Sequence, residues 1–150
     1  MERGYDIKKL GRQDERLFVQ LIALFHEVFE TGEGSCAPQT YPGTLLAKRE
    51  FVVFAAIDNG EVIGGLTAYE LPAYYSEGAE LYLYDIAVRS DCQGVGVGKK
   101  LLLAVQEYCR ENKIKVMFVE ANEEDEGAVK FYHATGGRAE RVVHFNFEIR

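Results

Sequence analysis

The stretch Gln93-Gly94-Val95-Gly96-Val97-Gly98 is the most informative part of this sequence, and it lies between an apolar segment and an amphipathic one. Its three alternating glycines permit backbone conformations that residues with a Cβ rarely adopt, and they leave several N–H groups open to one anion. The helix predicted next, from about Gly98 to Glu111, points its N-terminal N–H groups and the positive end of its dipole at the same place. The stretch therefore predicts a main-chain site for a cofactor that carries a pyrophosphate.

Two other phosphate-binding patterns fit this stretch poorly. A Walker loop requires G-x-x-x-x-G-K-[ST], but Gln93 stands where its first glycine belongs and Lys100 where its hydroxyl residue belongs. A dinucleotide fingerprint requires G-x-G-x-x-G, and counting from Gly94 the third glycine comes one residue too early. Too little chain also follows for a doubly wound sheet. Neither nucleotide-binding class is favoured.

Three motifs follow one another in the chain. The loop reads Q-x-x-G-x-G, the apolar segment Leu83–Val88 precedes it, and Ala128–Gly136 reads A-x-x-x-Y-x-x-x-G. Together they resemble the GNAT acetyltransferases, in which such a loop holds the pyrophosphate of acetyl-CoA. The resemblance implies a mixed α/β GNAT fold with a central, mostly antiparallel twisted sheet of about 6–7 strands, flanked by about four helices. We expect a single domain over residues 1–150.

The resemblance also implies a cofactor and the residues that hold it. Acetyl-CoA is the expected co-substrate, and no metal ion is expected. Asp125 stands where many relatives have an asparagine near the pantetheine arm, although an N-cap role for the helix that follows also accounts for it. The expected cofactor-binding residues are Ile86, Ala87, Val88, Gln93, Gly94, Val95, Gly96, Val97, Gly98, Lys99 and Asp125.

Length and composition indicate a globular protein in a reducing compartment. The chain has 150 residues, of which 47% are hydrophobic and 27% charged, as in ordinary water-soluble domains. No apolar run approaches the ~20 residues that span a bilayer, and no signal peptide is recognisable at the start. Cys36, Cys92 and Cys109 are odd in number and lack the spacing of metal ligands. We therefore expect a cytoplasmic protein with free thiols.

The net charge restricts the class of partner. The 24 acidic and 17 basic residues give a formal charge of −7. Such a field repels nucleic acid and anionic membranes and attracts cations. It favours a cationic substrate, although an acidic surface also serves solubility alone.

Hydrophobic periodicity and turn residues predict the order of the elements. A hairpin is expected around the Asn59-Gly60 turn, and Gly136-Gly137 is expected to end the last helix. Strands are predicted over Tyr5–Leu10, Phe51–Ile57, Glu61–Leu71, Glu80–Val88, Ile114–Glu120 and Arg141–Ile149, helices over Asp14–Glu30, Pro42–Arg49, 98–111 and 125–135, and a turn-rich segment over Gly32–Pro42.

Two residues are candidates for the chemistry of acetyl transfer. Asp85 interrupts the apolar segment between Leu83 and Ile86. Partial burial there would raise the pKa of its carboxyl toward the range of a general base, whereas a turn cap or an ion pair is the structural alternative. For Tyr132 the resemblance implies a general acid that protonates the sulfur of CoA, and an aromatic core residue is the alternative.

The acceptor is suggested by a resemblance to one branch of the family. Tyr69-Glu70-Leu71-Pro72, the strand Glu80–Val88 and the tail His144–Glu148 are similar to aminoglycoside 3-N-acetyltransferases of the gentamicin/fortimicin type, although Asn146 replaces an acidic residue. The branch implies direct attack in a ternary complex, an antibiotic-resistance role and a homodimer. A polyamine or protein amine as acceptor, or an acetyl-CoA-binding module without turnover, remain alternatives. The implied substrate-binding residues are Glu80, Tyr84, His144, Asn146 and Glu148.

Overall fold

The computed structural model describes residues 4–30 and 40–150. The chain divides into two compact units, residues 1–120 and 121–150, which we describe separately. The predicted turn-rich segment Gly32–Pro42 lies outside the described residues except for its last three, and Cys36 lies outside them as well. In the part that is described, no helix has both the length and the apolar character to cross a membrane.

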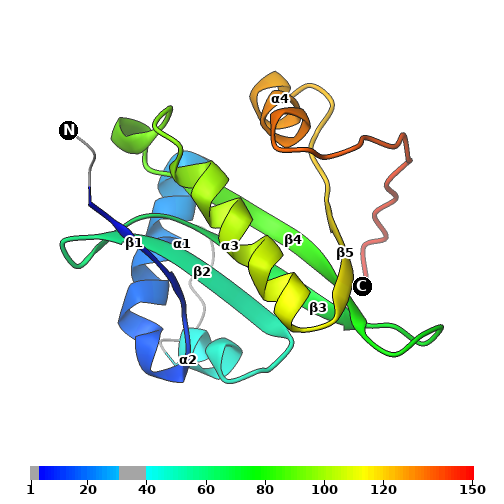
Figure 1. Ribbon diagram of the computed structural model, residues 1–150, viewed down its shortest axis with the longest axis horizontal. Helices are drawn as coiled ribbons and strands as arrows, with labels where there is room; N and C mark the ends of the chain where they lie inside the picture. The colour runs from blue at the N-terminus through cyan, green and yellow to red at the C-terminus, as the bar shows by residue number, and fades with distance from the viewer. Residues whose placement is uncertain (1–3, 31–39) are drawn as a thin grey trace. The chain divides into compact units, whose positions relative to one another are not determined.

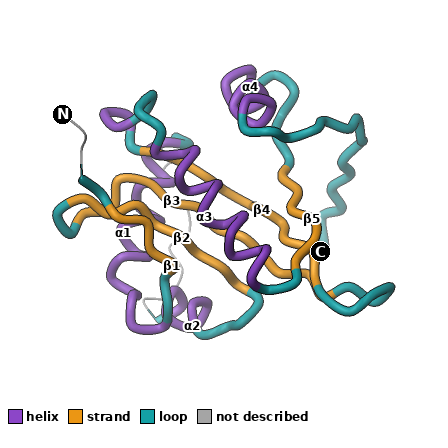
Figure 2. The backbone as a smooth tube through the Cα atoms, in the orientation of Figure 1, coloured by secondary structure: helices purple, strands orange, loops and turns teal. Residues whose placement is uncertain are grey.

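In its described residues, the first unit is built on one sheet of five strands in the order β1-β2-β3-β4-β5 (Figure 2). The first four strands pair antiparallel, and β5 lies parallel to β4. The mostly antiparallel sheet is confirmed. The strands are β1 Asp6–Lys9, β2 Phe51–Asp58, β3 Glu61–Pro72, β4 Ala79–Val88 and β5 Ile114–Val119.

Helices cover both faces of this sheet, as Figure 1 shows for α3 in front and α1 behind. Leu21 of α1 packs in one core with Val53 of β2. Phe54, the next residue of β2, faces the other way, and its ring meets that of Tyr108 on α3 at 6.0 Å between centroids. The helices are α1 Glu15–Val28, α2 Tyr41–Leu46 and α3 Val97–Glu111, with short 3-10 turns at Arg12–Asp14 and Ser90–Cys92.

A buried carboxylate fixes the connection from β1 to α1. Asp14 accepts hydrogen bonds from the Gly11 N–H at 2.8 Å and from Lys8 Nζ at 2.7 Å. Burial by itself raises the pKa of Asp14, but the two hydrogen bonds and the charge of Lys8 outweigh it and leave the pKa below its usual value. Asp14 is therefore a charged group whose carboxylate receives its hydrogen bonds within the fold.

The hairpin of β2 and β3 forms where the sequence predicts it. Asn59 and Gly60 have φ angles of 50° and 80°, which a two-residue turn of the type I′ class requires at both central positions. β2 then pairs with β3 from Asp58↔Glu61 to Phe51↔Tyr69.

The second unit contains one helix, α4, over Glu126–Ala134. The Asp125 side chain accepts the Ala128 N–H at 3.1 Å, so the predicted N-cap is confirmed. Gly136 follows with a φ of 98°, in the left-handed region that glycine favours at a helix end.

The predicted strand Arg141–Ile149 is wrong, and so is the count of six to seven strands. Residues 138–150 have no helix or strand, and Phe147 and Ile149 are 83% and 93% exposed. Alternation of apolar and polar residues shows which side chains would share a face, but a strand also needs a neighbouring backbone to complete its hydrogen bonds. Among the described residues, no strand pairs with this segment.

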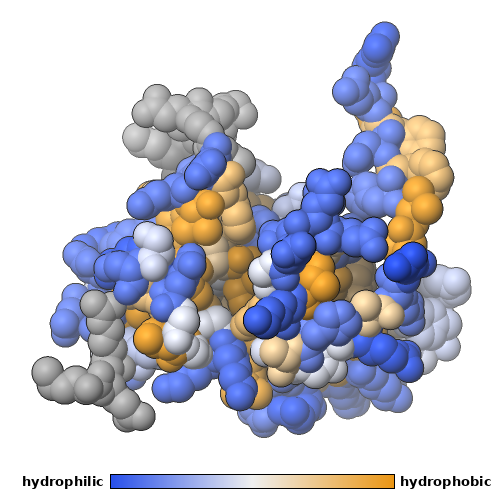
Figure 3. Space-filling model, turned by 90° about the horizontal axis from the view of Figure 1, so that it is seen from above, coloured by the Kyte–Doolittle hydropathy of each residue, from blue (hydrophilic) through white to orange (hydrophobic). Residues whose placement is uncertain are grey.

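The polar character of the surface agrees with the composition. In the face that Figure 3 shows, hydrophilic residues predominate and apolar residues emerge in separate patches. The expectation of one domain over residues 1–150 stays a prediction.

Gly65→Ala is expected to lower the free energy of unfolding by about 1–3 kcal/mol. A Cβ at Gly65 would lie 2.5 Å from Leu21 Cδ1 and 2.7 Å from the Phe54 carbonyl oxygen, so α1 would have to move off the sheet. Gly127→Ala is the control, because its Cβ would make ordinary contact at 3.7 Å inside α4 and should be neutral or stabilising. Urea unfolding measures both variants, and equal stability of Gly65→Ala and wild type would contradict the close packing of α1.

Candidate active site

A β-bulge near the end of β4 shapes the site. The register runs Thr67↔Asp85 and then Ala68↔Leu83, so that Tyr84 is the additional residue on β4. A bulge bends its strand and redirects the side chains beside it. Tyr84 is exposed as a result, and Asp85 lies across from the buried Thr67.

The direction of the backbone groups in β4 follows from one hydrogen bond. The Arg89 N–H donates to the Ile63 carbonyl at 2.8 Å, just beyond the strand end. In an antiparallel ladder, alternate residues turn both polar groups to the same neighbour, so Ala87 and Asp85 also face β3. The N–H and C=O groups of Ile86 and Val88 consequently face away from β3.

The side of β4 that Ile86 and Val88 face is an open edge. β5 pairs with β4 only from Ala79 to Leu83. Within the described residues, no strand pairs with that side of β4 from Tyr84 to Val88. The N–H groups of Ile86 and Val88 therefore lie where an extended ligand could take the place of a strand.

The glycine loop continues from this edge. Gly94 and Gly96 have φ angles of 79° and 90°, and a Cβ on either would meet no protein atom within 4 Å. The space over the loop is thus open, and the backbone needs glycine for its conformation. Gln93 Nε2 donates to the Val88 carbonyl at 2.9 Å, which ties the loop to the end of β4.

The N-terminus of α3 points into the loop. The first hydrogen bond of the helix joins the Lys100 N–H to the Gly96 carbonyl at 3.0 Å, so the N–H groups of residues 97–99 precede it and remain available to an anion. Lys99 is exposed, whereas Lys100 Nζ lies over the Tyr5 ring at 4.9 Å from its centroid. Val97 is buried and anchors the helix start.

Asp85 is half-buried at this junction, and burial raises the pKa of its carboxyl. Its charge in turn contributes to the raised pKa values of Tyr69 and Tyr82, for both of which burial is the largest cause. No salt bridge or hydrogen bond of the Asp85 carboxylate occurs in residues 4–30 and 40–150. This environment differs from that of Asp14 and is typical of a group that exchanges protons.

Sequence reasoning missed Arg89, which connects the turn before the glycine loop to the start of β3. Its Nε lies 2.6 Å from Asp91 Oδ1, and its guanidinium also reaches Glu61 at 3.6 Å, at the start of β3. The same guanidinium donates to Cys92 Sγ at 3.6 Å. In the sequence, the only sign of this ion pair was that Arg89 and Asp91 are two residues apart. The contact of Arg89 with Glu61 becomes visible only in the fold.

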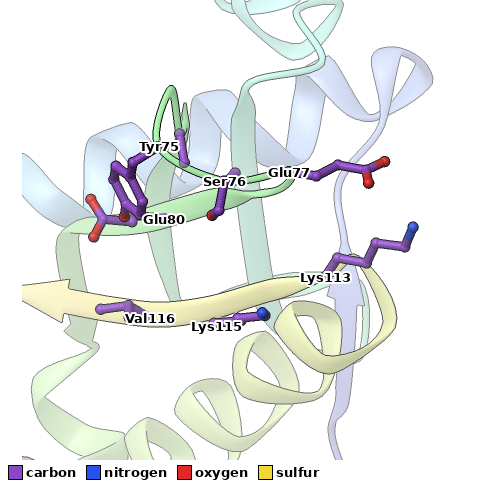
Figure 4. Close-up of a pocket in the computed structure, with 9 residues that line it drawn as sticks. Tyr75, Ser76, Glu77, Glu80, Lys113, Lys115 and Val116 are labelled. Carbon is purple, nitrogen blue, oxygen red and sulfur yellow. The ribbon is translucent and has the colours of Figure 1, made fainter.

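Glu80 lies at the other end of β4, away from the glycine loop. It lines a shallow cavity of about 130 Å³ together with residues of the β3–β4 connection and the start of β5. Figure 4 shows the Tyr75 ring beside the Glu80 carboxylate, and the Tyr75 hydroxyl donates to that carboxylate. The structure therefore does not bring Glu80 next to Asp85.

The remaining predicted residues belong to the second unit. Tyr132 is half-buried on α4, and its ring meets that of Phe131 at 5.3 Å. In the tail, His144 Nε2 lies 3.1 Å from Asn146 Oδ1, and Glu148 is exposed. The roles of these residues and the contact of Asp125 with a cofactor stay predictions.

Comparison with known proteins identifies the family. The Acetyltransferase (GNAT) family matches residues 18–136. The chain belongs to this family. The match begins in α1 and ends just after α4, so it includes β4, the glycine loop and Tyr132. A search of curated proteins found no significant match.

Solved structures include relatives that match nearly the whole chain. An aminoglycoside acetyltransferase from an uncultured soil metagenomic sample, in complex with sisomicin, is 37% identical over 97% of both chains, with a TM-score of 0.94. A second such enzyme from an uncultured soil metagenomic sample is 34% identical over 98% of this chain and 99% of its own, with a TM-score of 0.90. An aminoglycoside N-acetyltransferase in complex with CoA is only 20% identical over 99% and 98%, at a TM-score of 0.82, and shows the shared fold alone.

Asp85→Asn is expected to raise Tm by roughly 2–4 °C at pH 7. Burial raises the folded pKa of Asp85 above its ordinary value of 3.8, so the ionised carboxylate opposes folding at any pH above the folded pKa. Wild type should gain stability relative to the variant as pH falls through that pKa, and the difference should vanish near 3.8. Thermal unfolding from pH 4 to 8 measures this.

Asp6→Asn is the matched control for that comparison, because Asp6 is an exposed aspartate on β1. Its Tm difference from wild type should stay small at every pH. Equal Tm values of wild type and Asp85→Asn at pH 7, or a difference that grows as pH falls, would contradict the assigned environment of Asp85.

Proposed function

We propose that the protein transfers the acetyl group of acetyl-CoA to an amine of an aminoglycoside, at the 3-amino position, by direct attack in a ternary complex. Membership of the GNAT family supports acetyl transfer. The two soil enzymes, at 34–37% identity over nearly the full length, support the aminoglycoside as acceptor. The 3-amino position rests on the similarity of the strand Glu80–Val88 and the tail His144–Glu148 to that branch.

The single observation that carries the proposal is the position of Asp85. Its half-buried carboxylate follows the bulge residue Tyr84 in β4, one residue before Ile86 on the open edge and eight residues before Gln93, where the glycine loop begins. A base for the acceptor and backbone donors for an acyl carrier thus come from one short segment of chain. A binding module without turnover would not need a carboxylate with a raised pKa there.

The chain offers a fitting site for acetyl-CoA, which supplies an acetyl thioester when bound. The N–H groups of Ile86 and Val88 would bind the acetyl carbonyl and the pantetheine arm along the open edge of β4. The glycine loop, the N–H groups of residues 97–99 and Lys99 would bind the pyrophosphate, because the space over Gly94 and Gly96 is open. We assign Asp125 to the pantetheine end as well as to the cap of α4.

The chemistry requires two proton transfers. The acceptor amine must lose a proton before or as it attacks the thioester carbonyl, and Asp85 accepts that proton. The new C–N bond forms while the C–S bond breaks, and the Tyr132 hydroxyl gives its proton to the departing thiolate. The products are the amide and free CoA, so that no acyl group is left on the protein.

Two expectations about the protein in its source accompany this function. We propose a cytoplasmic, resistance-type enzyme that acts as a homodimer. The exposed apolar residues of the tail, among them Phe145 and Phe147, support a second copy as partner. His144, Asn146 and Glu148 are proposed to bind the acceptor from this tail.

Asp85→Asn is expected to lower kcat/KM by about 10²–10⁴-fold at pH 7 while the affinity for CoA changes little, because proton transfer is lost and the backbone donors are kept. Wild-type activity should fall as pH decreases through the raised pKa of Asp85, since the protonated carboxyl cannot accept a proton. Release of free thiol measures the rate, and calorimetric titration with CoA measures the affinity. Glu111→Gln, an exposed change at the end of α3, is the control.

The acceptor is tested with gentamicin-class aminoglycosides, spermidine and lysine peptides. Turnover of peptides or spermidine alone would contradict the aminoglycoside as acceptor and would still support acetyltransferase activity. Binding of acetyl-CoA with no turnover of any amine would favour the binding module. Near-normal turnover by Asp85→Asn across pH 6 to 9 would remove its role as base.

Added salt should weaken the binding of the acceptor more than the binding of acetyl-CoA. With a formal charge of −7, the protein attracts a polycation, and exposed charges are screened beyond about 10 Å at 0.1 M salt. We expect the KM of an aminoglycoside to rise roughly tenfold between about 0.05 and 0.5 M NaCl, without a parallel rise for acetyl-CoA. Steady-state kinetics at fixed pH measures both, and equal rises would contradict electrostatic attraction of the acceptor.

A further inference from the structure

A row of aromatic side chains crosses the sheet beside the proposed site. The register aligns four of them as direct neighbours on adjacent strands: Phe51↔Tyr69, Tyr69↔Tyr82 and Tyr82↔Phe118. The rings of Phe51 and Tyr69 lie 5.2 Å apart, and those of Tyr82 and Phe118 stack at 4.8 Å. Directly paired residues point to the same face of a sheet.

The bulge adds a fifth ring to this row. Tyr84 lies 5.6 Å from Tyr69 and 5.6 Å from Tyr82, nearly perpendicular to both. Without the additional residue at this point, strict alternation would separate Tyr84 from Asp85 on opposite faces. The bulge instead allows the Tyr84 ring and the Asp85 carboxylate to share the face that carries the row.

The face in question is the one that α1 covers elsewhere. Phe51 and Ala87 are both buried in the core under α1. Ala87 lies on the same face of β4 as Asp85, two residues away. From β2 outward the row emerges from this core, and Tyr69 and Tyr84 are 37% and 56% exposed. Exposed aromatic rings next to one another are a surface that binds something flat and partly apolar.

Carboxylates surround the exposed part of the row. Tyr82 is close enough to Glu120 and Asp85 that both charges add to the effect of burial in raising its pKa. Glu80 lies two residues before Tyr82 on the same face of β4. Their partners on β5, Val116 and Phe118, are likewise two residues apart. A cationic occupant is favoured, because aromatic faces and carboxylates both attract cations.

We propose that Tyr69, Tyr82 and Tyr84 form a platform on which a ring of the amino sugar acceptor lies flat, with its ammonium groups toward the carboxylates and its reacting amine at Asp85. The proposal rests on the proposed function and names the residues that select the acceptor. An amino sugar ring has an aliphatic face for the aromatic rings and charges at its rim for the carboxylates. A linear polyamine offers the charges without the ring face.

Paired substitutions separate the ring from the hydroxyl. Tyr82→Leu and Tyr84→Leu each remove an aromatic face, whereas Tyr82→Phe and Tyr84→Phe keep it. We expect each leucine variant to weaken sisomicin binding about tenfold and each phenylalanine variant to stay within about twofold of wild type. Spermidine binding should change less than about threefold in every variant. Calorimetric titration measures both ligands, and titration with CoA, together with Tm, shows that the fold and the cofactor site are intact.

Each outcome decides the proposal. Wild-type affinity for sisomicin in both leucine variants would overturn it, and so would an equal loss for spermidine and sisomicin, which would indicate charge rather than ring contact. If Tyr82→Leu fails to fold because its ring stacks on Phe118, the more exposed Tyr84 decides. A wild-type protein that neither binds nor acetylates any aminoglycoside would remove the proposed function itself, a result visible before any variant is made.

Discussion

The proposed site depends on β4 having two neighbouring strands along its first half and only one along its second half. β5 accompanies β4 as far as Leu83, and β3 continues to Val88. The strand is therefore held in place from one side, while on the other side the N–H groups of Ile86 and Val88 have no strand partner among the described residues. The bulge at Tyr84 stands at the same point, and it turns Asp85 toward the face that the open edge borders. Backbone geometry thus creates both halves of the site before any side chain is considered.

Two aspartates show how the fold assigns different tasks to the same side chain. Asp14 is buried but satisfied by Gly11 and Lys8, and its pKa is lowered. Asp85 is less buried and has no hydrogen bond or ion pair of that kind among the described residues, so desolvation alone raises its pKa. The first arrangement stabilises the charged form and serves the fold. The second arrangement lowers the stability of the protein at neutral pH and leaves a group that can take up a proton.

Local patterns in the sequence predicted local structure well and pairing less well. The helix over Asp14–Glu30, the Asn59-Gly60 hairpin and the Asp125 cap depend on neighbours within a few residues, and all three are confirmed. The strand predicted over Arg141–Ile149 depends on a distant partner that the pattern cannot name, and it was wrong. The aromatic row was invisible for the same reason, because Tyr69 and Tyr82 become neighbours only through the register of β3 and β4. Arg89 needed Glu61 from another strand before its position had a meaning.

In the proposed function the two substrates carry opposite charges, and this would explain why the chain uses different chemical groups at adjacent places. The proposed cofactor brings an anionic pyrophosphate to a protein of formal charge −7, and main-chain N–H groups at a helix start would attract it locally without cancelling the acidic surface. A cationic acceptor needs the reverse, and carboxylates beside aromatic faces provide it. Arg89 lies between Asp91 and Glu61, so carboxylates compensate its charge. Lys100 lies over the Tyr5 ring. In the proposed arrangement, the main-chain N–H groups attract the anion at the glycine loop, and the carboxylates of the neighbouring sheet face attract the amine.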